Sequence, residues 1–194
     1  PLSFRELACA GKAPKADDYL VRGGYPRLYN IEIPSDVYYS NYVTTYLDRD
    51  VSGLVNPQNL TLFNTFLKII ASSAGSLLNI TSLANETGVT TKTMRAWLSI
   101  LEQSYIVFYF YDTGLLCHLL GYTDALDAER SGALGPLFEN LVVSELVKRH
   151  LGSGKIPELY FYRDAQGAEV DLLDMTHHGS PSMFEIKSSR TFRS

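Results

Sequence analysis

The strongest constraint on the fold is a block of apolar residues at helical spacing within residues 60–101. Its first run predicts a helix that Gly75 closes. A second helix is predicted from Asn79 to the Thr87-Gly88 pair, and Thr90 and Thr91 then cap a third. Because glycine takes a positive φ at little cost, Gly88 suits the turn between the last two helices. With the apolar strand expected at residues 105–108, this order predicts a winged helix-turn-helix.

The third helix of this block carries the residues expected to contact nucleic acid. Thr91, Lys92 and Arg95 lie outside its apolar stripe of Met94, Trp97, Leu98 and Leu101. Nucleic-acid readers usually carry more basic side chains, since phosphate contacts dominate their affinity. The chain as a whole has a net charge of -4, which excludes binding by bulk positive charge and leaves only a local patch. Two interpretations stay open: a weak DNA contact through Thr91, Lys92 and Arg95, and a winged helix that is structural or contacts protein.

The regions on either side of this block complete a mixed α/β (α+β) organisation. Residues 1–60 predict a helical linker, with helices over residues 16–22 and from Ser35 to the Gly53 and Pro57 breaks. Residues 61–111 form the predicted winged helix-turn-helix. Residues 112–194 combine a long amphipathic helix over 137–151 with three strands over 159–162, 169–174 and 183–187. The apolar residues expected on the buried side of the long helix are Leu141, Val142, Leu146 and Val147.

Ionisable residues in this last region form the candidate catalytic group. In a strand, side chains alternate between faces, so Glu185 and Lys187 share one face while Phe184 and Ile186 take the other. Asp171 lies on the preceding strand of the same predicted hairpin, and Glu139 lies beside the apolar stripe of the long helix. Asp171 and Glu185 are the expected metal ligands, since Mg²⁺ takes a few carboxylates and keeps several waters. Glu139, Asp171, Glu185 and Lys187 together predict metal-assisted phosphodiester hydrolysis.

The same residues also fit a solvated strand face. Alternating acidic and basic residues on a strand usually form cross-strand ion pairs, each worth about 0.2–1 kcal/mol. The histidines are weaker candidates: His177 and adjacent His178 fit a surface turn, and His118 and His150 are isolated in the sequence, so a structural role is expected for them.

Several classes of protein are excluded or disfavoured. Two cysteines, Cys9 and Cys117, make neither a disulfide framework nor a structural zinc site, so the cytoplasm is the expected compartment. No apolar run approaches the roughly 20 residues that span a bilayer, and no signal peptide is apparent, so no membrane partner is expected. The chain starts at Pro1 without a methionine, and we expect it to be a piece of a longer protein.

Several motifs together resemble a known family. Residues 1–7 (PLSFREL) resemble the end of an AAA-type ATPase domain. Further motifs resemble a domain of unknown function, DUF4143, that follows such ATPases. They are GGYP (23–26), TYLDRDV (45–51), YDTGL (111–115), FEN (138–140), YRD (162–164), EVD (169–171) and EIKSS (185–189). The resemblance covers nearly the whole chain. It implies a PD-(D/E)xK nuclease-like, restriction-endonuclease-like α/β module after a winged helix, with Glu139, Asp171, Glu185 and Lys187 at the family's acidic and lysine positions.

The resemblance also sets expectations about context. It implies the C-terminal portion of a prokaryotic ATPase, with ATP bound only in an N-terminal domain outside this chain, DNA as a partner, and a number of subunits that stays open. Family members carry a basic segment near the Phe108–Tyr109 join and continue past Ser194, so we expect residues to be missing at both places. The alternative function is a non-catalytic interaction module that transmits the nucleotide state of the ATPase to a partner protein.

Overall fold

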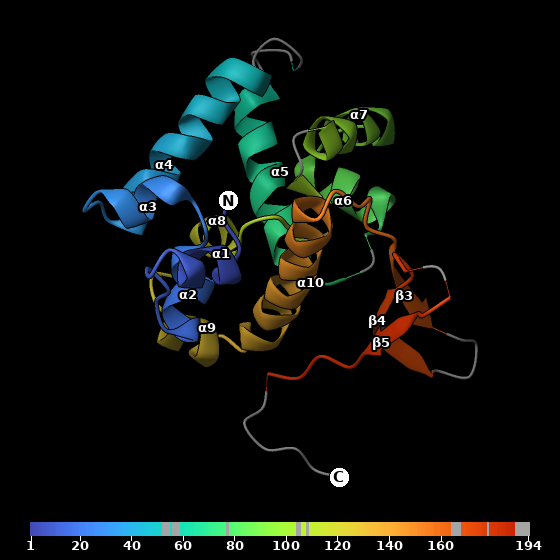
Figure 1. Ribbon diagram of the computed structural model, residues 1–194. Coiled ribbons are helices and arrows are strands. Elements are labelled where there is room, and N and C mark those ends of the chain that lie inside the picture. Colours follow the sequence, from blue (N-terminus) through green and yellow to red (C-terminus); the bar gives the residue numbers. More distant parts are fainter. Residues whose placement is uncertain are drawn as a thin grey trace.

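The computed structural model describes residues 1–51, 55, 59–76, 78–103, 106–107, 109–163, 168–177 and 179–188. It is a mixed helical structure with a small three-stranded antiparallel sheet, which confirms the α+β class (Figure 1). In the described part of the chain, no helix is long and apolar enough to cross a membrane.

The N-terminal part is built from short helices. They are α1 (Phe4–Cys9), α2 (Ala16–Arg22), α3 (Pro26–Asn30), α4 (Ser35–Tyr46) and the π-helix η1 (Leu47–Val51). The predicted helix over residues 16–22 is confirmed as α2, and the one from Ser35 as α4. The side chains of Ser3 and Glu6 form a capping box that fixes the start of α1, which the sequence analysis did not anticipate.

The helical block of the sequence forms three helices, α5 (Leu60–Ser72), α6 (Ile80–Thr87) and α7 (Thr91–Gln103). Asn79 caps α6 by accepting from two backbone N–H groups, and Thr90 Oγ1 accepts from Thr93 N at the start of α7. Gly88 has a φ of +71° in the turn between them. The three predicted helices and this turn are therefore confirmed.

Two very short strands follow, β1 (Ile106–Val107) and β2 (Tyr109–Phe110), which pair antiparallel. Tyr105 and Phe108 lie outside the described residues. The expectation that residues are missing at the Phe108–Tyr109 join concerns Phe108, so it also falls outside the described residues. The winged character of this block therefore stays a prediction.

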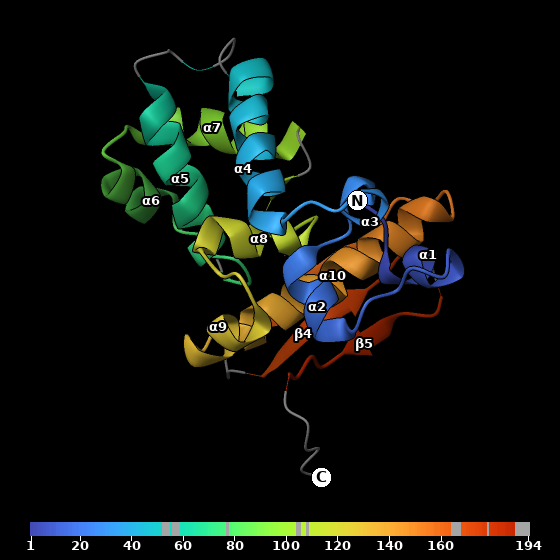
Figure 2. The ribbon, with the colours of Figure 1, turned by 90° about the vertical axis from the view of Figure 1, so that its left-hand side faces the viewer.

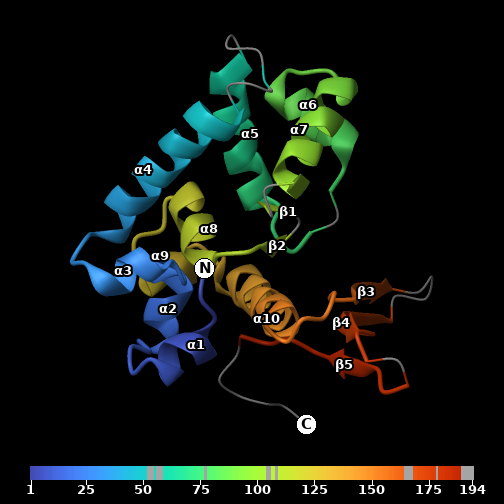
Figure 3. The ribbon, with the colours of Figure 1, turned by 45° about the horizontal axis from the view of Figure 1, so that its top comes forward.

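Helix α10 (Leu134–Gly152) lies between the N-terminal helices and the sheet (Figures 2 and 3). Two shorter helices precede it, α8 (Thr113–Leu120) and α9 (Ala125–Arg130). The hydrophobic core runs from Leu20 to Leu137, so it includes residues from all three predicted domains. The boundaries drawn at residues 60/61 and 111/112 stay predictions.

The sheet has the order β3-β4-β5, with β3 (Leu159–Arg163), β4 (Glu169–Asp174) and β5 (Ser182–Phe184). Leu159 pairs with Asp174, and Leu172 pairs with Phe184. The first two strands match their predictions, but the third ends at Phe184 rather than at Lys187.

The buried side of α10 differs from the prediction. Leu141, Val142, Leu146 and Val147 are only half-buried, whereas Asn140, Ser144, Lys148 and His150 are buried. The reason is that Asn140, Lys148 and His150 have partners elsewhere in the chain, while Ser144 donates to Leu141 O within the helix. Asn140, for example, accepts from Phe110 N at 2.6 Å and donates to Phe110 O at 2.8 Å. A buried polar group with partners is tolerated, and a periodicity argument does not see those partners.

The side chain of Asp112 connects three separate segments. Its carboxylate accepts from Tyr39 OH at 2.6 Å, Gly24 N at 2.7 Å and Leu115 N at 2.9 Å, the last of these capping α8. A side chain at Gly23, where φ is +73°, would collide with the Asp112 carboxylate and the Tyr39 hydroxyl. The GGYP and YDTGL motifs thus meet around one buried carboxylate.

We expect Asp112→Asn to lower the free energy of unfolding by about 3 kcal/mol, because the new amide NH₂ would face an N–H or O–H donor in the core. Denaturant unfolding measures this change. Asp124→Asn is the matched control, since Asp124 caps α9 through one bond to Asp127 N and is exposed. Asparagine caps helices about as well as aspartate, so the control should change by only a few tenths of a kcal/mol. Equal losses in the two variants would contradict the role given to Asp112.

Candidate active site around Asp171

Asp171 lies in β4 beside the segment that carries Glu185 and Lys187. Its Oδ2 accepts a hydrogen bond from Ile186 N at 2.6 Å. The last sheet pair before this point joins Leu172 and Phe184. β5 ends at Phe184, but continuing its register would set Asp171 opposite Glu185, and the bond to Ile186 shows that the chain still runs beside β4 there. Directly opposite residues have Cβ atoms about 4.5–5.5 Å apart.

Glu185 and Lys187 form an exposed ion pair. Lys187 Nζ lies 2.5 Å from Glu185 Oε1, and the two side chains are 61% and 72% exposed, respectively. The hydrogen bond and charge of Glu185 raise the pKa of Lys187, and the charge of Asp171 adds to this effect. Asp171, Glu185 and Lys187 are therefore brought together. Because the Glu185–Lys187 pair is open to solvent, it contributes little to stability.

The fourth predicted residue, Glu139, lies on α10 and contacts Tyr109. Tyr109 OH donates to Glu139 Oε1 at 2.7 Å. Burial raises the pKa of Tyr109 most, and the hydrogen bond and charge of Glu139 raise it further. The charge of Asp171 also contributes to that shift. Sequence reasoning missed Tyr109 because it treated the strand after α7 only as an apolar segment.

The donor chemistry of this group suits a hard cation. Asp171 and Glu185 offer carboxylate oxygens, which Mg²⁺ prefers. Across the described ranges, no three His, Cys, Asp or Glu side chains gather closely enough to hold a metal ion by themselves. An ion bound here would therefore depend on the two carboxylates and take its other oxygens from water and phosphate. Mg²⁺ accepts such a partial site, since it usually keeps several waters and binds through one or two carboxylates.

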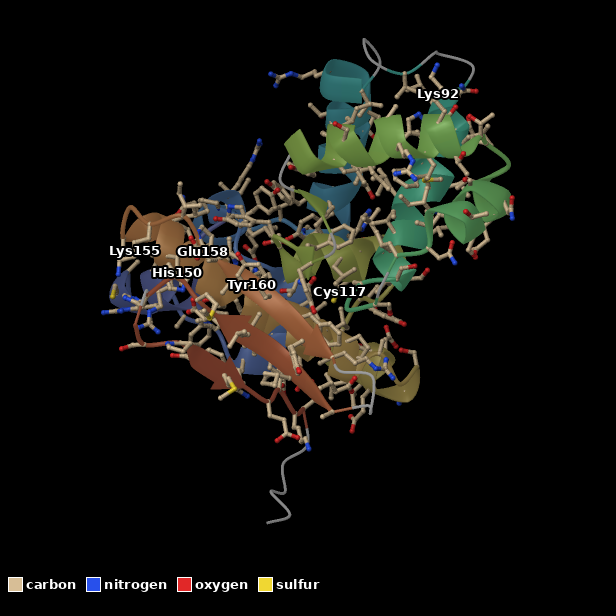
Figure 4. All side chains as sticks on the ribbon, turned by 90° about the vertical axis from the view of Figure 1, so that its right-hand side faces the viewer. Lys92, Cys117, His150, Lys155, Glu158 and Tyr160 are labelled. Carbon is tan, nitrogen blue, oxygen red and sulfur yellow. The ribbon has the colours of Figure 1, made fainter. Side chains whose placement is uncertain are left out.

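A second acidic residue of β4 points to the other side of the sheet. Asp174 Oδ2 lies 2.7 Å from Nε2 of His150 on α10, and both side chains are buried. Figure 4 labels His150 on α10 behind the sheet. Since side chains alternate along a strand, Leu172 and Asp174 take the side facing α10 and Asp171 takes the opposite side. The contact with Asp174 fits the structural role expected for His150. The sequence did not identify Asp174 as its partner, because the two residues are far apart in the chain.

The residues expected to contact nucleic acid lie elsewhere. Thr91, Lys92 and Arg95 are exposed on α7. In Figure 4, Lys92 lies at the far end of the helical block from Tyr160 on the sheet. The structure therefore does not bring α7 and the carboxylate group onto one shared surface.

Comparison with known proteins divides the chain into two parts. Residues 134–194 match the family model of a domain of unknown function, DUF4143. This agrees with the resemblance for α10 and the sheet. Residues 13–108 match a different family model, a domain of unknown function named DUF8612. The resemblance to DUF4143 is thus supported for the C-terminal part of the chain.

Two curated relatives are also similar. They are the uncharacterized protein Mb2031c of Mycobacterium bovis and the uncharacterized protein Rv2008c of Mycobacterium tuberculosis, each 29% identical over 197 residues that cover 91% of this chain. The chain spans 44% of the length of each relative. No solved structure matches significantly.

The buried His150–Asp174 pair predicts a specific acid sensitivity. Burial acts to raise the pKa of Asp174, but hydrogen bonds from Thr176 and His150 outweigh it and lower that pKa below 3.8. A lowered folded-state pKa stabilises the protein above the unfolded value and loses this contribution as the pH falls through the folded value. We expect the free energy of unfolding to fall below about pH 4, and Asp174→Asn to flatten this dependence.

Denaturant unfolding between pH 2 and pH 6 measures the effect. Asp17→Asn, an exposed first-turn residue of α2, is the control for loss of one negative charge. If the free energy of unfolding fell as steeply with decreasing pH in Asp174→Asn as in the control, the His150–Asp174 pair would not be the cause of the acid sensitivity.

Proposed function

We propose that α10 and the sheet form a Mg²⁺-dependent phosphodiesterase that acts on nucleic acid, with Asp171, Glu185 and Lys187 as its catalytic residues and Glu139 assisting. The observation that carries the proposal is the 2.6 Å bond from Ile186 N to Asp171. It fixes the Asp171 carboxylate beside the residues on either side of Ile186. Two carboxylates can hold a metal ion that polarises a phosphoryl oxygen and activates a water, and a lysine beside them can offset the charge that develops on the phosphate.

Each residue has a distinct role in this proposal. A bound Mg²⁺ would polarise a phosphoryl oxygen and lower the pKa of a bound water. Asp171 and Glu185 hold the cation, and the backbone bond from Ile186 keeps the Asp171 carboxylate oriented. Lys187 stays protonated because Glu185 and Asp171 raise its pKa, so its ammonium can offset the negative charge that develops on the phosphate. Glu139, whose carboxylate accepts from Tyr109 OH, would assist as a further carboxylate.

The proposal extends to the rest of the protein. The helix-turn-helix would act as a winged DNA-binding unit, with α7 contacting duplex DNA through Thr91, Lys92 and Arg95. The longer protein would be a cytoplasmic AAA-type ATPase in which this region follows the ATP-binding domain. The length of the two relatives, of which this chain covers 44%, leaves room for such a domain.

A second candidate function is a non-catalytic interaction module. One observation favours it: Tyr160 and Met183 both pair with Leu173, so the three residues form a row across one face of the sheet. Tyr160 and Met183 are large hydrophobic residues that stay exposed, with Met183 at 73%. An exposed apolar row of this kind is typical of a protein contact. In this case the carboxylate group would be a solvated strand face.

The decisive test is cleavage by the full-length protein. Wild type is incubated with single- and double-stranded DNA and RNA in Mg²⁺ or Mn²⁺, and we expect cleavage that EDTA abolishes. Lys187→Ala should lower the rate by about 100-fold or more, because the lysine acts on the transition state and its exposed side chain is not needed for folding. Asp171→Asn should have a similar effect, with partial rescue by excess metal.

Lys15→Ala, which removes an exposed lysine that belongs to neither the carboxylate group nor α7, controls for purity and charge and should retain measurable cleavage. Absence of cleavage by wild type under all conditions would favour the interaction module. Cleavage that persists in both active-site variants would show that the site is misplaced.

Duplex DNA binding tests the role of α7 separately. We expect Lys92→Ala with Arg95→Ala to reduce the slope of log K against log salt by about 1.8, which corresponds to two lost phosphate contacts on duplex DNA. Anisotropy of a labelled duplex in EDTA measures the slope, and Lys68→Ala on α5 is the single-charge control. An unchanged slope in the double variant would support the structural or protein-contact interpretation of the helix-turn-helix.

A further inference from the structure

A groove of about 820 Å³ runs along α10 on the side away from the helical block. Its walls come from α1, the second half of α10, Lys155 and His177, and Phe184 of β5 closes it at the sheet. One contact fixes the walls relative to each other, because Phe4 N of α1 donates to Glu145 Oε2 of α10 at 2.8 Å. This volume is within the range of ligand pockets, about 300–1,000 Å³.

The rim of the groove is positively charged. Arg5, Arg149 and Lys155 are exposed, and none of them forms an ion pair within the described part of the chain. Lys155 Nζ lies 3.2 Å from a ring nitrogen of His177, which adds a further nitrogen group to the rim.

The two acidic residues of the groove are already engaged. Glu6 Oε2 accepts from both the backbone N–H and the hydroxyl of Ser3. Glu145 accepts from Phe4 N, from Tyr19 OH and from buried Lys148, whose Nζ lies 3.0 Å away. The groove is therefore a local cationic patch on a chain whose net charge is -4.

The floor of the groove is apolar. Leu141, Val142, Leu146 and Phe184 supply it. A ligand that suits this combination has a flat apolar part and a phosphate, as an unpaired nucleotide does. Stacking of a base on an aromatic ring contributes about 1–3 kcal/mol, and Phe184 can supply such a ring. In a duplex, each base is stacked within the helix, so its faces are not available to this floor.

We propose that this groove binds single-stranded nucleic acid, with phosphates at Arg5, Arg149 and Lys155 and a base against Phe184. Phe184 lies on the edge strand β5 directly before Glu185, so a strand bound in the groove would reach the candidate active site, on the opposite face of the sheet, around this edge. Binding is independent of cleavage, whereas the groove's role as a path for the substrate strand rests on the proposed function.

The experiment measures binding of a labelled 12-nucleotide oligo-dT by the full-length protein in EDTA, at several salt concentrations. Arg149→Ala with Lys155→Ala should weaken binding by about tenfold and reduce the salt slope by about 1.4, since each phosphate contact on a single strand contributes about 0.7. Lys15→Ala with Lys68→Ala is the matched control, because it removes the same charge from exposed positions outside the groove. The control should bind as wild type does.

Two further arms test the base contact. An abasic strand of equal length and a duplex of the same sequence should both bind more weakly than oligo-dT, and Phe184→Ala should remove most of the difference between oligo-dT and the abasic strand. Equal binding of the abasic strand by wild type would overturn the nucleotide site in favour of simple polyanion binding. Equal loss in the groove and control double variants, or no binding by wild type, would overturn the groove altogether.

Failure of this proposal and failure of the nuclease proposal are distinguishable. Binding in EDTA does not require cleavage, so a protein that binds oligo-dT through Arg149 and Lys155 but never cleaves would keep the groove and lose the nuclease. If the groove double variant cleaved single strands with the same kcat/KM as wild type, the nuclease proposal would stand and the groove would be lost as the path of the substrate strand.

Discussion

The structure depends on three polar side chains that α10 buries, Asn140, Lys148 and His150, because each of them holds a different part of the chain. Asn140 pairs with both backbone groups of Phe110 and so fixes β2 against the helix. Lys148 and Glu145 connect to Tyr19 of α2 and to the start of α1. His150 holds the end of β4 through Asp174. An unpaired polar group of this kind costs roughly 1–3 kcal/mol when buried, so these pairings favour one arrangement of helices and sheet over alternatives.

This arrangement also places the candidate functional groups. Because α10 is fixed to β2 through Asn140, the neighbouring residues Glu139 and Tyr109 come within hydrogen-bonding distance of each other. Because it is fixed to β4 through His150, the exposed side chain of Arg149 lies along the groove that ends at Phe184. The proposed catalytic group and the proposed strand-binding groove thus both depend on structural contacts of adjacent residues on one helix.

Much of the local structure was predictable because its causes are local. The cap at Asn79 and the positive φ at Gly88 involve residues within a few positions of one another. The network around Asp112 was not predictable, since its partners Gly24 and Tyr39 lie 88 and 73 residues away. The inner face of α10 was predicted wrongly for the same reason: hydrophobic periodicity assumes that polar residues face water, and it has no information about a distant His150–Asp174 or Asn140–Phe110 pair. Tyr109 was missed because only its position beside Glu139 gives its hydroxyl a role.

The electrostatics around Asp171 explain how the fold tolerates the acidic residue Glu185, directly after β5, close to Asp171 of β4. Like charges directly opposite each other destabilise a sheet, so Asp171 and Glu185 require compensation. Ile186 N supplies part of it to Asp171, and Lys187 supplies the rest to Glu185. The Glu185–Lys187 pair is exposed, so water screens it and separating its charges requires little free energy. The buried carboxylates of Asp112 and Asp174 differ in this respect, since backbone or side-chain donors hold them in place away from solvent. Asp171 and Glu185 are more accessible than these two buried carboxylates, and this supports their proposed role as the cation-binding group.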